Sequence, residues 1–179
     1  MILVVHAHPY PRRSRGGAAL LAGIAGLADL EVRSLYELYP DFDVDAAAEQ
    51  AALRRADLVV WLGPLYWYTT PALMQLWMEK VLVSDFANSE GNTALAGKAC
   101  LWAVTTGGGE YAVGGPHDHP FEDFAPVVEM TARYCGMRWL EPFVVHDPAA
   151  LSDDELAGRA RALRERLLEV APSPVGEGG

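Results

Sequence analysis

The 179-residue sequence predicts an α/β fold in which helices cover both faces of a doubly wound, five-stranded parallel sheet. Two observations lead to this fold class. Five apolar, β-rich runs alternate with helical stretches along the chain. Two of these runs, MILVV and LVVWL, are apolar throughout, which is typical of parallel strands buried on both faces. The expected strands are Ile2–His6, Glu31–Leu35, Leu58–Leu62, Lys98–Thr105 and Trp139–His146.

Five segments between or after these runs have helical patterns: Arg15–Ala28, Asp45–Arg55, Pro71–Val83, Phe121–Tyr134 and Ser152–Val170. The first is rich in Ala and Leu. The second has acids early and arginines late, which matches the helix dipole. The third begins with proline, whose missing N–H costs little in a first turn. Gly136 follows the fourth as a C-terminal cap, and SDDE opens the fifth with the Ser152 and Glu155 pair of a capping box.

Length and composition restrict the classes of protein. The chain fits one domain, which we expect over residues 1–171, followed by a disordered Pro/Gly-rich tail over residues 172–179. A formal net charge of −10 argues against nucleic-acid and membrane-surface binding. No apolar run approaches the ~18–20 residues that span a bilayer, and MILVV lacks the basic start of a signal peptide. We therefore expect a soluble, cytoplasmic protein. Cys100 and Cys135 form no CxxC pair and are expected to be buried, reduced thiols.

The segment HAHPYPRRSRGG follows the first expected strand and contains no GxGxxG. Ser14 is placed to cap the next helix, and the free N–H groups of a helix start suit a phosphate. The alternative is a plain helix cap with solvated arginines. His6 and His8 form an HxH pair such as barrel metallohydrolases use, but those barrels need ~250 residues. We therefore place His8 beside the phosphate and expect no metal. Charge at this site can come from the neighbouring arginines, Arg12, Arg13 and Arg15.

The segment GPLYWYTTPALMQLWMEKV follows the third expected strand. Pro64 ends the strand, and Leu65–Tyr68 presents aromatic side chains and free amides that suit the edge of a flat, amphipathic ring system. Trp77 and its neighbours at helical spacing are expected to pack in the core or in a dimer face.

The segment VTTGGGEYAVGG follows the fourth expected strand. Thr105 and Thr106 offer hydroxyls, and Gly107–Gly109 lets the backbone lie flush against a planar ligand. A flexible turn or a phosphate cradle is the alternative, although the GK[ST] of a Walker loop is absent. The carboxyl ends of parallel strands meet at one edge of a sheet. The three loops together therefore predict a phosphorylated tricyclic ligand, FMN.

Five motifs extend over nearly the whole chain: AHPYPRRS (7–14), LYELYPDFDVD (35–45), PLYWYTTPALMQLWMEKV (64–81), GKACLWAVTTGGGE (97–110) and YCGMRWLEPF (134–143). With them the sequence resembles the flavodoxin-like NAD(P)H:quinone oxidoreductases, and most closely the ancillary proteins of glutathione-regulated potassium-efflux antiporters. HP followed by Ser, with WAVTTGGGE, is specific for the family, and YPDF favours the ancillary subgroup.

The resemblance implies a flavodoxin-like fold that holds FMN rather than FAD. It assigns the phosphate and ribityl contacts to His8, Ser14, Arg15, Gly16 and Gly17. It assigns the ring contacts to Pro64, Leu65, Tyr66, Trp67, Tyr68, Thr105, Thr106, Gly107 and Gly108. Tyr111 and His117 are expected to face the substrate, and His119 is the alternative to His117 for this role. Gly17 departs from relatives that often carry a polar residue there.

The resemblance also implies the reaction and the partners. Hydride passes from NAD(P)H to FMN N5 and then to a quinone or similar electrophile, in a homodimer whose active site lies at the subunit interface. One alternative is a regulatory subunit of a potassium-efflux antiporter, held through that partner at the inner face of the cell membrane. A second is a one-electron flavodoxin carrier, for which the acidic charge suits docking to a basic partner. The sequence leaves the choice between NADH and NADPH, and the acceptor, open.

Overall fold

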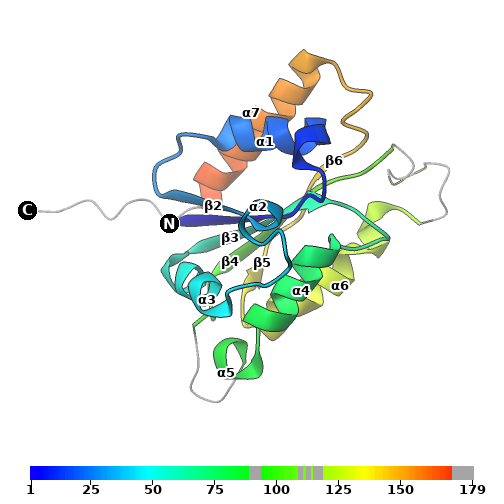
Figure 1. The fold of residues 1–179 in the computed structure, drawn as a ribbon. Helices are drawn as coiled ribbons and strands as arrows, with labels where there is room; N and C mark the ends of the chain where they lie inside the picture. The colour runs from blue at the N-terminus through cyan, green and yellow to red at the C-terminus, as the bar shows by residue number, and fades with distance from the viewer. Residues whose placement is uncertain (89–93, 109–110, 112–113, 115–118, 171–179) are drawn as a thin grey trace, which may run out of the picture.

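A parallel β-sheet forms the centre of the structure, with helices above and below it (Figure 1). The computed structural model describes residues 1–88, 94–108, 111, 114 and 119–170. Within them the strand order is β2-β1-β3-β4-β5, with β6 also pairing with β4, and every pair is parallel. The strands are β1 (Ile2–His6), β2 (Leu30–Ser34), β3 (Leu58–Pro64), β4 (Ala99–Thr105), β5 (Arg138–Trp139) and β6 (Phe143–Val145). The order reverses between β1 and β3, which confirms the doubly wound fold class.

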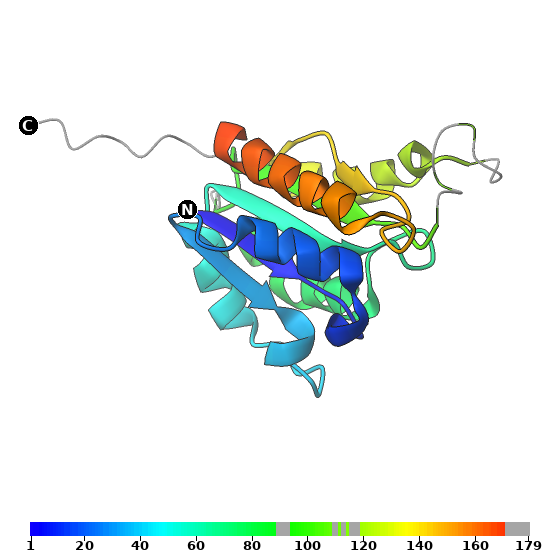
Figure 2. The same cartoon turned by 90° about the horizontal axis from the view of Figure 1, so that it is seen from above.

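Helices α1 and α7 cover one face of the sheet, and α3, α4 and α6 cover the other (Figures 1 and 2). Two apolar clusters, one on each face, account for the continuous burial of β1, β3 and β4. The α-helices of the described residues are α1 (Arg15–Ile24), α2 (Leu35–Leu38), α3 (Ala46–Arg55), α4 (Ala72–Val81), α5 (Ser84–Ala87), α6 (Ala125–Tyr134) and α7 (Asp153–Val170). Short 3-10 turns at Pro11–Arg13 and Phe121–Asp123 precede α1 and α6.

The helix ends follow the expected caps. Ser152 and Glu155 exchange bonds as a capping box, with Ser152 N donating to the Glu155 carboxylate at 2.8 Å and Glu155 N donating to Ser152 Oγ at 3.3 Å. Gly136 has φ +73°, the left-handed conformation that a glycine after a helix adopts readily. The first helix stops at Ile24 rather than Ala28, and Gly26 just beyond it has φ +73°. The predicted tail 172–179 lies outside the described residues.

The fifth predicted strand, Trp139–His146, is wrong as a single element. It consists of β5 and β6, which pair with the two ends of β4 and are separated by the segment 140–142. Pro142 has no N–H to donate within this segment, so an uninterrupted ladder of hydrogen bonds cannot pass through it. The sheet is therefore parallel, as predicted, but has a sixth strand.

A fully buried carboxylate joins three elements beneath the sheet. Glu49 of α3 accepts hydrogen bonds from Arg33 Nε (2.9 Å) on β2, Tyr39 Oη (2.6 Å) after α2, and Trp77 Nε1 (2.8 Å) on α4. These bonds offset the cost of removing the carboxylate from water. Trp77 is consequently a core residue, in agreement with the first of its two predicted roles.

Candidate functional site

The loops after β1, β3 and β4 begin side by side at the carboxyl edge of the sheet. His6 is paired with Leu62, and Pro64 is paired with Thr105. Leu65 N continues this alignment by donating to Thr105 O at 2.8 Å. The edge between β1 and β3 is the point at which the strand order reverses, where ligands of open α/β sheets bind.

The first loop ends in the predicted helix cap. Ser14 Oγ accepts a hydrogen bond from Gly17 N at 3.1 Å, and Ser14 is buried. A Cβ on Gly16 would lie 2.8 Å from two carbon atoms of Pro148, so close packing requires glycine at this position. A Cβ on Gly17 would lie 2.6 Å from Ser14 Oγ, so glycine there leaves room for the cap.

Arg15 does not direct its charge at this helix start. Its guanidinium donates to the carbonyl oxygens of Pro148 and Leu151, the latter at 2.7 Å, and pairs with Asp153 at 2.7 Å. These contacts use the Arg15 side chain to tie α1 to the start of α7, so that of the three arginines offered as sources of charge at the anion site, Arg15 has its side chain held elsewhere. The residue can contribute only its main-chain N–H to a ligand.

His8 lies between the first and second loops. Its Nδ1 accepts a hydrogen bond from Tyr10 N at 3.0 Å, so in the neutral ring the proton is on Nε2, which is then a donor. Burial lowers the pKa of His8 below its usual value of 6.5, which favours this neutral form. Its ring packs edge-on against Tyr66, with 6.1 Å between the ring centroids.

The second loop is a tight hairpin with two strained residues. Tyr66 and Thr69 exchange main-chain hydrogen bonds at 2.9 and 3.1 Å. Between them Trp67 and Tyr68 have φ +50° and +66°, a left-handed conformation that is uncommon for residues with a side chain. The Trp67 side chain is nevertheless 90% exposed. Such strain concentrates at functional sites.

The third loop leaves open space beside Gly107. A Cβ on Gly107 would meet no atom of the described residues within 4 Å, and the φ of Gly107 lies outside the left-handed region. Neither packing nor backbone strain therefore requires glycine here. Gly63 on β3 is the opposite case, because its Cβ would lie 2.6 Å from Ala7 O. Gly109 lies outside the described residues.

Hydrogen bonds from its neighbours hold the start of the third loop. Thr106 N donates to Val145 O at 3.1 Å, and Thr106 Oγ1 donates to Gly108 O at 2.7 Å. Thr106 Oγ1 also lies 3.1 Å from Nδ1 of His146. The sequence patterns did not single out His146. Its position in the sequence does not show that it lies beside Thr106, because that contact depends on how β6 pairs with β4.

The predicted substrate-facing residues have different outcomes. Tyr111 joins an aromatic group, with its ring centroid 6.4 Å from that of Tyr68 and 6.1 Å from that of Phe124. His117 lies outside the described residues. His119 pairs with Asp123, with Nδ1 2.9 Å from Oδ2. The structure therefore brings Tyr111 to the second loop and gives His119 a carboxylate partner.

The HxH pair consists of His6, the last residue of β1, and His8, which follows the strand. Nδ1 of buried His6 lies 3.2 Å from Ser34 Oγ. Across the described ranges, no group of three or more His, Cys, Asp or Glu side chains is placed to hold a metal ion. The two cysteines, Cys100 and Cys135, are free and buried, as expected. In the same part of the chain, no helix has the length and apolar character needed to cross a membrane.

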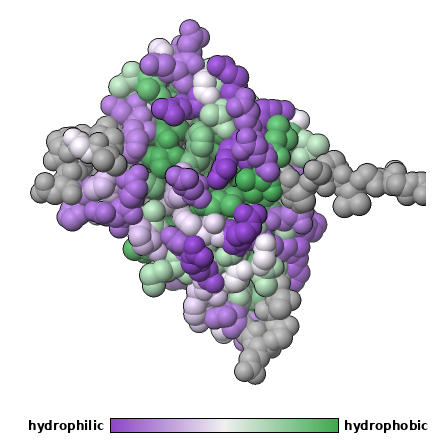
Figure 3. Space-filling model, turned by 180° about the vertical axis from the view of Figure 1, so that it is seen from behind, coloured by the Kyte–Doolittle hydropathy of each residue, from purple (hydrophilic) through white to green (hydrophobic). Residues whose placement is uncertain are grey.

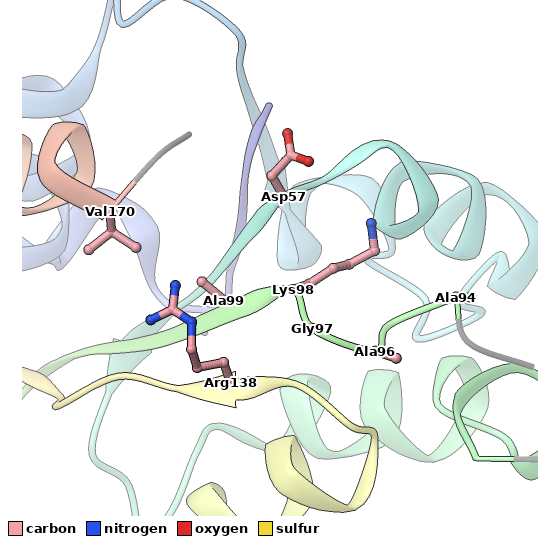
Figure 4. A pocket seen from close by; sticks show the side chains of 8 residues that line it. All are labelled: Asp57, Ala94, Ala96, Gly97, Lys98, Ala99, Arg138 and Val170. Atoms are coloured by element: carbon pink, nitrogen blue, oxygen red, sulfur yellow. The ribbon is translucent and has the colours of Figure 1, made fainter. Parts of the chain in front are cut away.

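A pocket of about 510 Å³ lies at the opposite, amino-terminal edge of the sheet (Figure 4). Asp57, Ala99 and Arg138 line it at the starts of β3, β4 and β5. Lys98 also lines it, and its ammonium donates to the carbonyl oxygens of Arg54, at 3.0 Å, and Ala56. This pocket shares no residue with the three loops.

The molecule seen from behind has a largely hydrophilic surface with apolar residues gathered toward its middle (Figure 3). Val127, Met130 and Tyr134 of α6 repeat at helical spacing and are all more than 60% exposed.

Comparisons with known proteins agree with this architecture. A family model described as flavodoxin-like fold matches residues 1–167. The glutathione-regulated potassium-efflux system ancillary protein KefF of Salmonella typhimurium is 49% identical over 171 residues, which cover 94% of this chain and 96% of that protein.

Three solved structures share the fold. A thermophilic tryptophan halogenase from Streptomycin violaceusniger superposes with a TM-score of 0.87 at 31% identity, over 93% of this chain and 98% of the other. General stress protein 14 of Treponema denticola, in complex with FMN, superposes with a TM-score of 0.86 at 29% identity, over 95% and 99%. An NADPH-quinone reductase from P. pentosaceus superposes with a TM-score of 0.83 at 27% identity, over 93% and 96%. The chain thus belongs to the flavodoxin-like fold family that includes the KefF ancillary proteins.

Proposed function

We propose that this protein binds FMN at the carboxyl edge of its sheet and uses it to reduce quinones or similar electrophiles with NAD(P)H. The observation that carries the proposal is the free space beside Gly107, at a loop that neighbours a capped helix start and a strained aromatic hairpin. A phosphate and a flat ring are the two ligand parts that these surroundings suit. The FMN complex and the NADPH-quinone reductase among the structural neighbours support the same chemistry.

The residues present fit FMN in three places. The main-chain N–H groups at the start of α1, the Ser14 hydroxyl and Nε2 of His8 are donors for the phosphate. Leu65 has a buried side chain, so it would contribute only its main chain to the ring edge. The open backbone at Gly107 would face the ring itself.

When bound, FMN supplies the hydride chemistry, and the protein supplies binding, orientation and electrostatics. The exposed rings of Trp67 and Tyr68 offer apolar surface that would exclude water from one side of the site. Tyr111, packed near Tyr68, is the described residue that we propose as a proton donor to the acceptor oxygen. His117 is a second proposed donor, from outside the described residues.

A homodimer with the site at the subunit interface is part of the proposal. Trp67 is 90% exposed in one subunit although it is held in a strained conformation. A second copy of the chain lying over this hairpin would bury the indole ring and complete the wall of the site. Sedimentation velocity of wild type and of Trp67→Ala tests this part, because the variant is expected to shift toward the monomer.

Absorbance and turnover test the main proposal. Purified protein is expected to carry a flavin spectrum or to acquire one on titration with FMN, and then to oxidise NADH or NADPH in the presence of quinones. Protein that takes up no FMN would refute it. Rapid reduction of the flavin by NAD(P)H without any partner protein argues against a one-electron carrier as the main role. Halogenation is not proposed, because the site suits a phosphate and a ring and the 49% identity is to the ancillary proteins.

A second proposed role is that of an ancillary subunit of a potassium-efflux antiporter. The identity of 49% to the KefF ancillary proteins, over nearly the full length of both chains, favours it. Pull-down with the cytosolic domain of such an antiporter, with and without NAD(P)H, tests this role, and absence of binding under both conditions would contradict it.

A further inference from the structure

His146 follows the last residue of β6 and lies beside the third loop. Thr105 of β4 is paired with Val145, and Thr106 N donates to Val145 O at 3.1 Å. This register brings Nδ1 of His146 to 3.1 Å from Thr106 Oγ1. The contact joins two segments 40 residues apart in the chain.

The directions of the hydrogen bonds follow from the number of protons. A hydroxyl carries one proton, and Thr106 Oγ1 donates it to Gly108 O at 2.7 Å. Thr106 Oγ1 must then act as the acceptor toward His146, so the proton of the ring is on Nδ1. His146, Thr106 and Gly108 thus form a directed series of two hydrogen bonds that fixes the turn on each side of Gly107.

Protonation of His146 leaves this series intact, because Nδ1 is a donor in both the neutral and the charged ring. Burial, the largest cause, and the positive charge of Arg159 on α7 lower the pKa of His146, whereas the carboxylate of Glu122 in the 3-10 turn before α6 raises it. Near pH 7 the ring is therefore mostly neutral. Negative charge added at the third loop would favour the protonated ring.

We propose that His146 is the positioning residue of the third loop: through Thr106 it holds Gly107 and Gly108 against the flavin ring, and it takes up a proton when that ring becomes negative. This inference rests on the proposed function. NAD(P)H gives up a hydride, two electrons with one proton, and becomes NAD(P)⁺. His146 Nε2 takes one further proton from solvent, which balances the charge gained at the ring. When the acceptor takes the hydride, it also needs one proton to become the hydroquinone, and the proton held at His146 Nε2 would be released in that step. The sum is then balanced: NAD(P)H, the acceptor and one proton give NAD(P)⁺ and the hydroquinone.

Variants of His146 separate positioning from proton uptake. His146→Ala removes the donor, and the loss of one hydrogen bond of ordinary strength is expected to weaken FMN binding about fivefold. His146→Asn keeps an N–H donor near the position of Nδ1 but cannot titrate, so it should restore FMN affinity to within about twofold of wild type at pH 8. Fluorescence titration with FMN measures both constants.

Proton uptake has its own measurement. The pH dependence of the midpoint potential is expected to give one proton fewer per two electrons in His146→Asn than in wild type. In wild type, the NMR-detected pKa of His146 should rise on reduction of the bound flavin. A merely structural role for His146 moves neither quantity.

Thr106→Val breaks the same series at its centre. It should weaken FMN binding as His146→Ala does, and the double variant should lose no more than either single variant, because the three residues act as one unit. Thr131→Val is the matched control, since Thr131 Oγ1 donates to the main-chain oxygen of Val127 within α6 in the same manner. Thermal melts of each apoprotein establish that it is folded.

The outcomes distinguish the proposed FMN-dependent function from the proposed role of His146. If wild type binds no FMN, the proposed function fails and the role of His146 fails with it. If wild type binds FMN but His146→Ala and Thr106→Val bind it equally well, only the role of His146 is overturned. If His146→Asn keeps the wild-type number of protons per two electrons, the proton uptake is overturned.

Discussion

Replacing Gly107 by alanine tests whether the open space of the third loop is reserved for a ligand. Among the described residues, the added Cβ would meet no atom within 4 Å, and the φ of Gly107 lies outside the left-handed region. The folded protein should therefore keep its stability or gain about 0.4–1 kcal/mol, because alanine restricts the unfolded chain more than glycine does. A flat ring lying against the backbone would instead collide with the new methyl group.

Overpacking of this kind costs about 1–3 kcal/mol, which corresponds to roughly 5- to 150-fold weaker FMN binding. Fluorescence titration with FMN and urea unfolding of the apoprotein measure the two effects separately. Gly158→Ala in α7 is the matched control, since its Cβ would meet only the end of the Arg161 side chain at 3.7 Å. It should leave FMN affinity unchanged. A Gly107→Ala variant that binds FMN as tightly as wild type would refute the reasoning.

Three further substitutions address other residues. Ser14→Ala and Ser152→Ala each remove a helix cap worth about 0.5–2 kcal/mol of stability. Only Ser14→Ala should also weaken FMN binding, by roughly tenfold or more, because it loses a hydrogen bond to the charged phosphate. Equal FMN affinities of the two variants in a titration would contradict this. Glu49→Ala leaves two buried donors, Tyr39 and Trp77, and the half-buried Arg33 without their acceptor, so it should lower the free energy of unfolding by about 3–5 kcal/mol in urea. A loss under 1 kcal/mol would show that water replaces the carboxylate. Burial, with the charge of His8 as a smaller cause, lowers the pKa of His6 to about 4 in the folded protein. The unfolded chain therefore binds more protons below pH 6.5, so stability should fall by on the order of 3 kcal/mol from pH 6.5 to pH 4 in wild type and by clearly less in His6→Gln.

The class of the sheet, parallel with helices on both faces, could be predicted because it depends on patterns that are local in sequence. A few consecutive residues suffice to recognise the continuous apolar runs of β1, β3 and β4. The same holds for the helix caps at Ser14 and Ser152. The break between β5 and β6 was missed because one proline, Pro142, carries it within a run that is otherwise rich in apolar residues. A proline in an expected strand was the available signal.

The candidate site could be predicted at the level of loops but not of all side chains. Arg15 has the right position for an anion site, yet its guanidinium reaches Asp153, 138 residues away, and no local pattern shows that contact. His146 meets Thr106 only because β6 pairs with the end of β4. Both results depend on tertiary contacts between distant segments.

The glycines of the carboxyl edge show how a structure separates packing from ligand binding. In sequence, nothing distinguishes Gly16 at a helix start, Gly63 at a strand end and Gly107 in a loop. Contacts explain the first two, because Pro148 and Ala7 O occupy the positions that a side chain would need. Nothing within the described residues explains the third. Residues that break local rules without an internal reason are expected at functional sites. Trp67, a large side chain held at φ +50° and left almost fully exposed, breaks another such rule in the neighbouring loop. These two departures lie in the adjacent loops after β3 and β4, at the carboxyl edge of the sheet, and they support the proposal that a ligand binds between them.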